Sequence, residues 1–260
     1  MFDALYVAAS GMRGQQMQID TIAHNLANVN TNGFRREVAS FSEVSAAVTA
    51  NAVDDAGRPV APTSVMRGAG VTSSLALSSL AGELKPTGES LDIAIDGIGF
   101  IEVIRADGTP AYTRAGKLHI NEDRLLAAQD GSPLSAHIEI PPDVRKIDVQ
   151  PDGRVMALLG DSEESVELGQ IELAAFPNAT ALTAAGANLY VAPPAAGEPQ
   201  VAAPGQLGMG VLRQGFLESS NVQLTDELVT MMLAQRAFEL NSRVVQAADQ
   251  LLSIINSLYR

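Results

Sequence analysis

The sequence predicts an α+β fold, mainly β in its middle. Long N- and C-terminal helices pair as a coiled coil, and an antiparallel β domain is inserted between them. Two observations predict this arrangement. Apolar residues recur at alternating spacings of three and four near both ends of the 260-residue chain, which is the pattern of a helical seam. Short runs of alternating polar and apolar residues fill the middle and are separated by Asp-Gly pairs typical of hairpin turns.

The N-terminal stripe predicts a helix from about residue 3 to residue 29. Its positions are Leu5, Ala8, Met12, Gln15, Ile19, Ile22, Leu26 and Val29. A 3-4 alternation that continues for more than three heptads indicates a coiled-coil seam. The stretch from Asn30 to Gly33 signals the end of this helix, because glycine readily adopts the left-handed conformation that closes helices.

Two adjacent apolar stripes predict a C-terminal helix from about residue 223 to residue 258. The first stripe consists of Leu233, Ala237, Leu240, Val244, Ala247, Leu251, Ile254 and Leu258. The second consists of Leu224, Leu228, Met231, Phe238, Val245, Leu252, Ile255 and Tyr259. Together they make a face wide enough to pack against more than one helix. Periodicity alone also allows an ordinary bundle within a single chain.

The middle of the chain, residues 91–176, predicts an antiparallel sandwich or barrel. Alternating runs at 91–95, 101–103, 146–149 and 170–173 predict strands. The predicted hairpin turns are Asp96-Gly97, Asp107-Gly108, Asp130-Gly131 and Asp152-Gly153.

These patterns divide the chain into five predicted segments. They are an N-terminal helix and cap (1–41), an extended connector (42–72), a β domain (73–192), a return connector (193–220) and a C-terminal helix (221–260).

Composition excludes several classes of protein. With 17 basic and 30 acidic residues the net charge is −13, and such a surface repels nucleic acid, so no nucleic-acid partner is expected. No run of 18 apolar residues is present, which predicts no membrane insertion. The chain has no cysteine, and therefore no disulfide or thiolate metal site. Asp3, Arg13 and Asp20 interrupt the N-terminus, so we expect no cleaved signal peptide.

Residues with catalytic or metal-binding potential do not form a recognisable pattern. His24, His119 and His137 are scattered, without partners at ligand spacing. Neither a phosphate-binding loop nor a Gly-x-Ser-x-Gly motif is present. We therefore predict no catalytic residue, no cofactor and no metal, and a protein that is not an enzyme.

Four sequence blocks resemble the rod, hook and hook-associated family of bacterial flagellar axial proteins. Residues 25–34 (NLANVNTNGF) are similar to the family's Asn-Leu-Ala-Asn block with its Thr-x-Gly-aromatic ending. Residues 92–100 (DIAIDGIGF) resemble its second block, and residues 112–116 (YTRAG) with Asp130-Gly131 resemble its third, although Ile101 and Ala115 depart from the commoner aromatic and Asp. Residues 214–242 carry QGFLESSNV, ELV and QRAFELNS, which resemble subunits of the distal rod.

The resemblance implies a structural role. In this family the terminal helices form an inner coiled-coil layer, the β domain projects outward, and copies stack into a helical tube. It implies a subunit of the distal rod that transmits torque from motor to hook across the periplasm and is exported by the flagellar type III apparatus. The implied partners are further copies of the chain, proximal rod and hook proteins along the axis, and surrounding ring proteins.

The expected assembly interface combines apolar stripe positions with residues of the family blocks. It consists of Leu5, Met12, Ile19, Ile22, Asn25, Leu26, Asn28, Thr31, Gly33, Phe34, Leu228, Gln235, Arg236, Phe238, Leu240, Asn241, Val244, Leu251, Ile254 and Leu258.

Two alternatives stay open. A proximal rod or hook component would share every family block. A secreted β-domain adhesin or enzyme with helical oligomerisation arms would share the helix–β–helix pattern, but it should show a signal peptide or a cluster of catalytic residues.

Overall fold

The computed structural model describes residues 2–43, 71–160 and 165–258. The chain forms two compact units. The helical unit consists of Met1–His24, Ala39–Leu75 and Thr225–Arg260, and the β unit consists of Asn25–Val38 and Ala76–Leu224.

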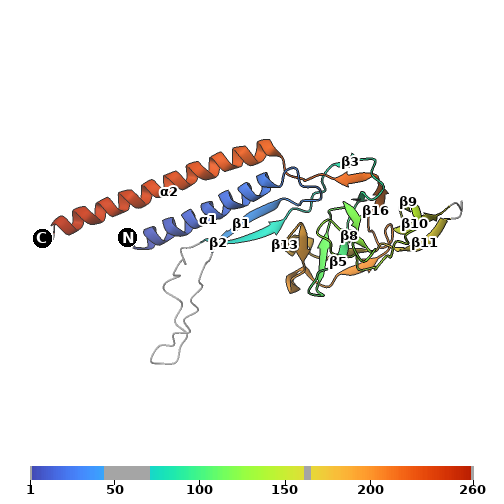
Figure 1. The fold of residues 1–260 in the computed structure, drawn as a ribbon. Coiled ribbons are helices and arrows are strands. Elements are labelled where there is room, and N and C mark those ends of the chain that lie inside the picture. Colours follow the sequence, from blue (N-terminus) through green and yellow to red (C-terminus); the bar gives the residue numbers. More distant parts are fainter. Residues whose placement is uncertain (1, 44–70, 161–164, 259–260) are drawn as a thin grey trace, which may run out of the picture. The chain divides into compact units, whose positions relative to one another are not determined.

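Both predicted helices are confirmed as α1 (Phe2–Ala27) and α2 (Leu224–Leu258). They lie side by side and run in opposite directions (Figure 1). α1 ends two residues before the predicted position because tight turns replace the helix, with Asn28 N donating to Asn25 O and Val29 N to Leu26 O. Asp226 and Glu227 in the first turn of α2 complement the positive end of its helix dipole. Coiled-coil pairing of the two helices stays a prediction.

Two glycines within α1 permit close packing in the helical unit. A Cβ atom at Gly11 would lie 3.4 Å from Asn241 Nδ2 of α2. A Cβ at Gly14 would lie 3.1 Å from the ring of Phe41 in β1 (Glu37–Glu43). α1 therefore contacts α2 on one side and β1 on another.

β1 pairs with β2 (Val71–Leu77) in a two-stranded sheet. The predicted connector 42–72 lies outside the described residues except for residues 42–43 and 71–72 at its two ends.

The β unit is built from antiparallel pairs, as predicted. Its largest sheet has six strands, in the order β13 (Thr183–Gly186), β14 (Leu189–Val191), β6 (Pro110–Thr113), β5 (Phe100–Ile104), β12 (Leu173–Ala175) and β15 (Gln200–Ala202). A second has the order β11 (Ser165–Gln170), β10 (Arg154–Leu159) and β9 (Val144–Val149).

Three further pairs and two short helices complete the β unit. The pairs are β16 (Val211–Gln214) with β4 (Ile93–Asp96), β17 (Phe216–Glu218) with β3 (Leu84–Pro86), and β7 (Leu118–Ile120) with β8 (Leu126–Ala128). The 3₁₀ helices are η1 (Ala179–Ala181) and η2 (Pro194–Ala196).

Two groups of buried side chains form the core of the β unit. The larger is aliphatic and includes Ile93, Val103, Leu134, Val155 and Leu173. The smaller is aromatic: the ring of Phe176 lies edge-on to Tyr112 at 4.7 Å and to Phe100 at 6.2 Å between centroids, and Phe100 lies 6.1 Å from Tyr190. Edge-to-face packing at these separations is favourable.

Two of the four predicted hairpin turns join paired strands. Asp107-Gly108 connects β5 to β6, and Asp152-Gly153 connects β9 to β10. Asp130-Gly131 closes a short turn in which Ala128 N donates to Ser132 O. The hairpin predicted at Asp96-Gly97 is wrong, because β4 pairs with the distant strand β16 and not with β5.

Two other segments differ from expectation. The run 170–173 is not one strand, since β11 ends at Gln170 and β12 begins at Leu173. Residues 193–220, expected to form a connector, contain β15, β16 and β17. These strands pair with β12, β4 and β3, so this part of the chain completes the β unit.

Candidate assembly site

The end of α1 folds back through the side chain of Asn25. Its amide Nδ2 donates to the backbone oxygen of Glu37 at 2.8 Å, and the Glu37 N–H donates to Asn25 Oδ1 at 2.9 Å. Asn25 is 1% exposed, so both bonds are shielded from water. Thr31 donates its hydroxyl to Asn28 Oδ1 at 3.2 Å, which stabilises the intervening turn. The Asn-Leu-Ala-Asn block thus closes a reverse turn at the end of the helix.

Gly33 allows this turn to lie directly against the β domain. Its φ is +72°, and a Cβ atom there would lie 2.5 Å from the carbonyl carbon and oxygen of Arg114. Its N–H donates to the backbone oxygen of Glu218 at 2.7 Å. Only glycine meets both requirements, because a left-handed backbone and a missing Cβ are needed together. Phe34 next to it is buried.

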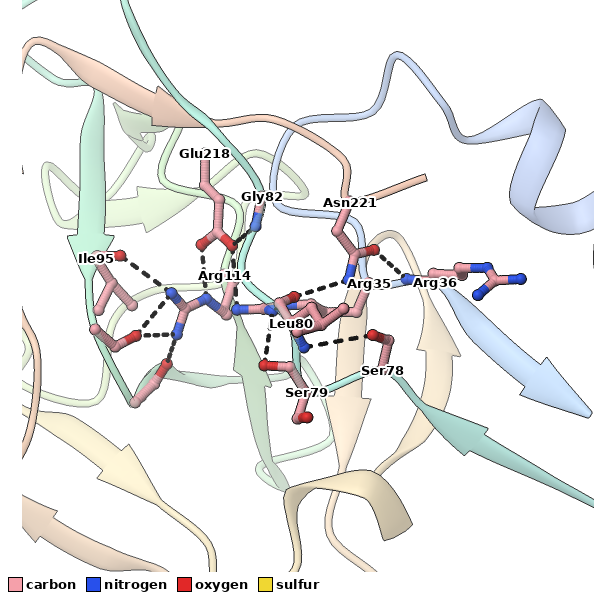
Figure 2. Close-up of polar contacts among 12 residues, drawn as sticks. Arg35, Arg36, Ser78, Ser79, Leu80, Gly82, Ile95, Arg114, Glu218 and Asn221 are labelled. Carbon is pink, nitrogen blue, oxygen red and sulfur yellow. Dashed lines mark hydrogen bonds and ion pairs between the residues drawn. The ribbon is translucent and has the colours of Figure 1, made fainter. Parts of the chain in front are cut away.

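A buried ion cluster made of Arg35, Arg114 and Glu218 lies beside this turn (Figure 2). Arg114 Nε donates to Glu218 Oε2 at 2.7 Å, and Arg35 Nη2 lies 3.1 Å from Glu218 Oε1. The side chains of Arg114 and Glu218 are each 2% exposed, and that of Arg35 is 6% exposed. The cluster therefore buries two positive charges with one negative charge.

Backbone oxygens satisfy most of the remaining guanidinium donors. Arg114 Nη1 donates to the oxygens of Gly97 and Gly99, and its Nη2 to those of Ile95 and Gly97, over 2.6 to 3.1 Å. Arg35 Nη1 donates to the oxygen of Leu80. These bonds fix the loop between β4 and β5 and the segment before β3.

Arg35 is the less well compensated of the two buried guanidiniums. Burial and the neighbouring Arg114 lower the pKa of the Arg35 guanidinium, while Glu218 acts in the opposite direction. Its Nε is buried and has no hydrogen-bond partner within the part of the chain that the structure describes. An unpaired buried donor destabilises the fold, so this position lowers the free energy of unfolding.

Asn221, in the segment just before α2, binds the backbone on both sides of this cluster. Its Oδ1 accepts the Arg36 N–H at 2.7 Å, and its Nδ2 donates to the oxygen of Leu80 at 2.8 Å (Figure 2). A polar groove of about 530 Å³ lies alongside, lined by residues 29–32, 80–85 and 219–223 in part.

In the helical unit, α2 has two faces of opposite character. Residues at heptad spacing on one face, Glu227, Ala234 and Asn241, are buried or half-buried, and Asn241 is the α2 residue nearest Gly11. At about 100° of rotation per residue, the exposed apolar side chains lie on the flanks and far side of the helix, away from this line and interspersed with exposed charged residues. The exposed apolar side chains are Leu224, Leu228, Val229, Met232, Leu233, Leu240, Val244 and Ile254.

Neither helix is long and apolar enough to cross a membrane within the residues described. In the same residues, no group of three His, Cys, Asp or Glu side chains could hold a metal ion.

Comparison with known proteins identifies the family. Three family models match, described as "Flagella basal body rod protein" (residues 5–35), "Flagellar hook protein FlgE/F/G D1 domain" (94–157) and "Flagellar basal body rod FlgEFG protein C-terminal" (213–258). "Flagellar basal-body rod protein FlgG" of Borreliella burgdorferi is 39% identical over the full length of both chains. The chain belongs to the FlgG family of flagellar basal-body rod proteins. The proteins of the same name from Agrobacterium fabrum (36% identical, 97% of this chain and 98% of the relative) and Bacillus subtilis (34%, full length of both) agree.

The ion cluster draws one residue from each segment that matches this FlgG family. Arg35 is the last residue of the first matched segment, Arg114 lies in the second and Glu218 in the third. The cluster is therefore the place where three separately matched segments of the family meet.

The predicted interface residues occupy different environments. Ile22, Asn25, Gly33 and Phe34 are buried. Met12, Ile19, Leu26, Asn28, Thr31, Phe238 and Asn241 are half-buried. Leu228, Gln235, Arg236, Leu240, Val244 and Ile254 are exposed. The side chains of Leu5, Leu251 and Leu258 lie outside those described.

Burial separates these residues by what they do within one chain. Asn25, Gly33 and Phe34 are brought together in the β unit, where they anchor the turn. The exposed residues of α2 are free to contact another molecule. Participation of the whole set in assembly stays a prediction.

Sequence reasoning missed the roles of Arg35, Arg114, Glu218 and Asn221. Arg114 and Glu218 lie inside the family blocks YTRAG and QGFLESSNV, where a charged residue among apolar and small ones was the available signal. The pairing itself had no local signal, because the three charged residues are far apart in sequence.

Proposed function

We propose that the chain is a structural subunit of the distal rod of the flagellar basal body. Copies polymerise helically into a rigid driveshaft that transmits torque from the motor to the hook across the periplasm. Family membership supports the rod assignment, and the exposed apolar face of α2 supports polymerisation.

The exposed face of α2 carries the argument for self-assembly. Leu233 and Leu240 are each 62% exposed and Val244 is 56% exposed, and the three lie together on one flank of α2 beside its buried face. Exposed apolar side chains gathered along one flank of a helix in this way mark a protein interface. A contact between unlike surfaces of identical subunits that does not close into a ring generates a helical filament. Further copies of this chain are therefore the proposed occupants of this face.

The remaining parts of the proposal concern the finished rod. The terminal helices pair as a coiled coil in an inner layer, and the β unit projects outward toward surrounding ring proteins. Proximal rod and hook proteins contact the polymer at its two ends. The net charge of residues 42–220 is −12, so the outward surface is acidic.

A deletion of the gene followed by electron microscopy of basal bodies tests the location. We expect rods that stop before the outer ring and carry no hook. Complete rods without a hook would assign the chain to the hook, and loss of the whole rod would assign it to the proximal rod. Intact, rotating flagella would contradict any axial role.

A matched pair of leucine substitutions tests the α2 face. Leu240→Asp should prevent complementation of the deletion, because it places a charge in the proposed interface. Leu207→Asp is the control, since Leu207 is 80% exposed but belongs to the β unit. Equal complementation by both variants, with normal rods, would contradict assembly through this face.

A further inference from the structure

The carboxylate of Glu218 contacts three segments that are far apart in the sequence. Its Oε1 receives the N–H of Gly82 at 2.8 Å and lies 3.1 Å from Arg35 Nη2. Its Oε2 receives Arg114 Nε at 2.7 Å. One carboxylate thus binds the segment that follows α1, the segment before β3 and the strand region around β6.

The backbone of Glu218 adds a second connection to the segment that follows α1. Its carbonyl oxygen accepts the Gly33 N–H at 2.7 Å, and three residues later Asn221 Oδ1 accepts the Arg36 N–H at 2.7 Å. Glu218 itself is the last residue of β17, six residues before α2 begins. The chain leaving α1 and the chain entering α2 are therefore held by the same few residues.

We infer that Glu218 is a positioning residue that locks both helix connections to the β domain. Force on either helix passes through the covalent chain into this cluster, so the two connections move together or not at all. This role rests on the proposed function, since the rod is the source of the torque. It adds to that function the route by which a rod subunit resists the torque.

The charge balance explains why a carboxylate is needed. Both ion pairs of the buried guanidiniums Arg35 and Arg114 end on Glu218. Removing one partner of a buried ion pair leaves an uncompensated charge, which is far more damaging than losing a surface pair. A glutamine would keep the size of the side chain but leave two buried positive charges facing each other.

Hydrogen exchange on the purified full-length chain tests the lock without requiring a rod. In Glu218→Gln we expect the amides of Gly33, Arg36 and Gly82 to exchange together about tenfold faster or more. Glu83→Gln is the matched control, because Glu83 is exposed in the same segment as Gly82. Unchanged exchange at these three amides in Glu218→Gln would overturn the lock.

A second variant keeps the inference testable if Glu218→Gln does not fold. Arg35→Met removes the ion pair to Glu218 and the bond to the Leu80 oxygen, and leaves the bonds of Glu218 to Arg114 and Gly82. We expect faster exchange at Gly33 and Arg36 with a smaller increase at Gly82, whose N–H keeps its bond to Glu218. Equal loss at all three amides, or at none, would overturn the assignment of separate arms.

Rotation of tethered cells tests the mechanical part. Under high viscous load, cells with Glu218→Gln should stop rotating more often than cells with Glu83→Gln. Normal rotation under load, despite the faster exchange, would overturn the transmission of force through Glu218. If the chain is not a rod subunit, the deletion strain will have intact flagella. That outcome leaves the hydrogen-exchange result unaffected, so the two failures can be told apart.

Discussion

Asn25 and Glu37 face each other across the turn that ends α1, and the amide of Asn25 both donates to and accepts from the Glu37 backbone. The Asn25 side chain thus makes the two hydrogen bonds to the Glu37 backbone that a residue of a neighbouring strand would otherwise make. It explains why the turn after α1 requires an amide at this position, since a carboxylate supplies acceptors but no donor.

Asn25→Asp should therefore lower the free energy of unfolding of the β unit by about 1–3 kcal/mol, because a buried carboxylate would face the Glu37 carbonyl oxygen. Urea denaturation followed by near-UV circular dichroism measures it. Asn30→Asp is the control, because Asn30 lies exposed in the same turn and the substitution adds the same charge. Equal losses in the two variants would contradict the donor role of Asn25.

Gly33→Ala should lower the free energy of unfolding by well over about 1 kcal/mol, because it adds a steric clash to the strain of a left-handed backbone. Gly88→Ala separates the two effects, since Gly88 has a similar φ of +77° but no atom within 4 Å of an added Cβ. Thermal unfolding of both variants gives the comparison. A similar loss at both positions would show that Gly33 does not pack against Arg114.

Gly11→Ala should raise the stability of the helical unit by up to about 1 kcal/mol, because alanine favours the helix and its Cβ would make an ordinary contact with Asn241. Gly11→Leu should lower it, since the longer side chain cannot fit at that contact. Circular dichroism at 222 nm during thermal unfolding distinguishes them. Stabilisation by leucine would mean that α1 and α2 are not closely packed at Gly11.

Glu102 should contribute more to the stability of the β unit as the pH falls toward about 4.5, because the pKa of Glu102 is raised by burial and by the neighbouring Glu172. Both carboxylates line a cavity of about 60 Å³, and Glu102 lies opposite Tyr112 in the sheet. A raised pKa in the folded state means that protonation favours folding. The contribution is present at low pH and is lost as the pH rises through the folded pKa.

Glu102→Gln tests this by removing the titration. The variant should be more stable than the wild type at pH 7.5, and the difference should shrink at pH 4.5. Urea denaturation at both pH values measures it, with exposed Glu122→Gln as the control. A difference that does not change with pH would contradict the titration of Glu102.

Local sequence patterns determined the helices and part of the β topology. The stripe and its closing Asn-Gly stretch located α1 to within two residues at its C-terminus, and the C-terminal helix to within one residue at its start. Asp107-Gly108 and Asp152-Gly153 formed the predicted hairpin turns because both flanking strands pair with each other. These features depend on residues close together in the chain, so local propensity and spacing suffice.

Tertiary structure decided the features that depend on distant residues. Asp96-Gly97 has a hairpin sequence, but Ile95 pairs with Leu212 because β16 offers β4 a partner from far along the chain. The two apolar stripes of α2 look alike in sequence, but in the structure Leu240 and Val244 of the first are exposed while Met231 and Phe238 of the second are half-buried.

The candidate site follows the same division. The sequence by itself determined the family, the helical arms and the closing of the first helix at the Asn30–Gly33 stretch. Only the tertiary structure assembled Arg35, Arg114 and Glu218, since burial of a charge depends on the partners that folding brings to it and not on its neighbours in the chain.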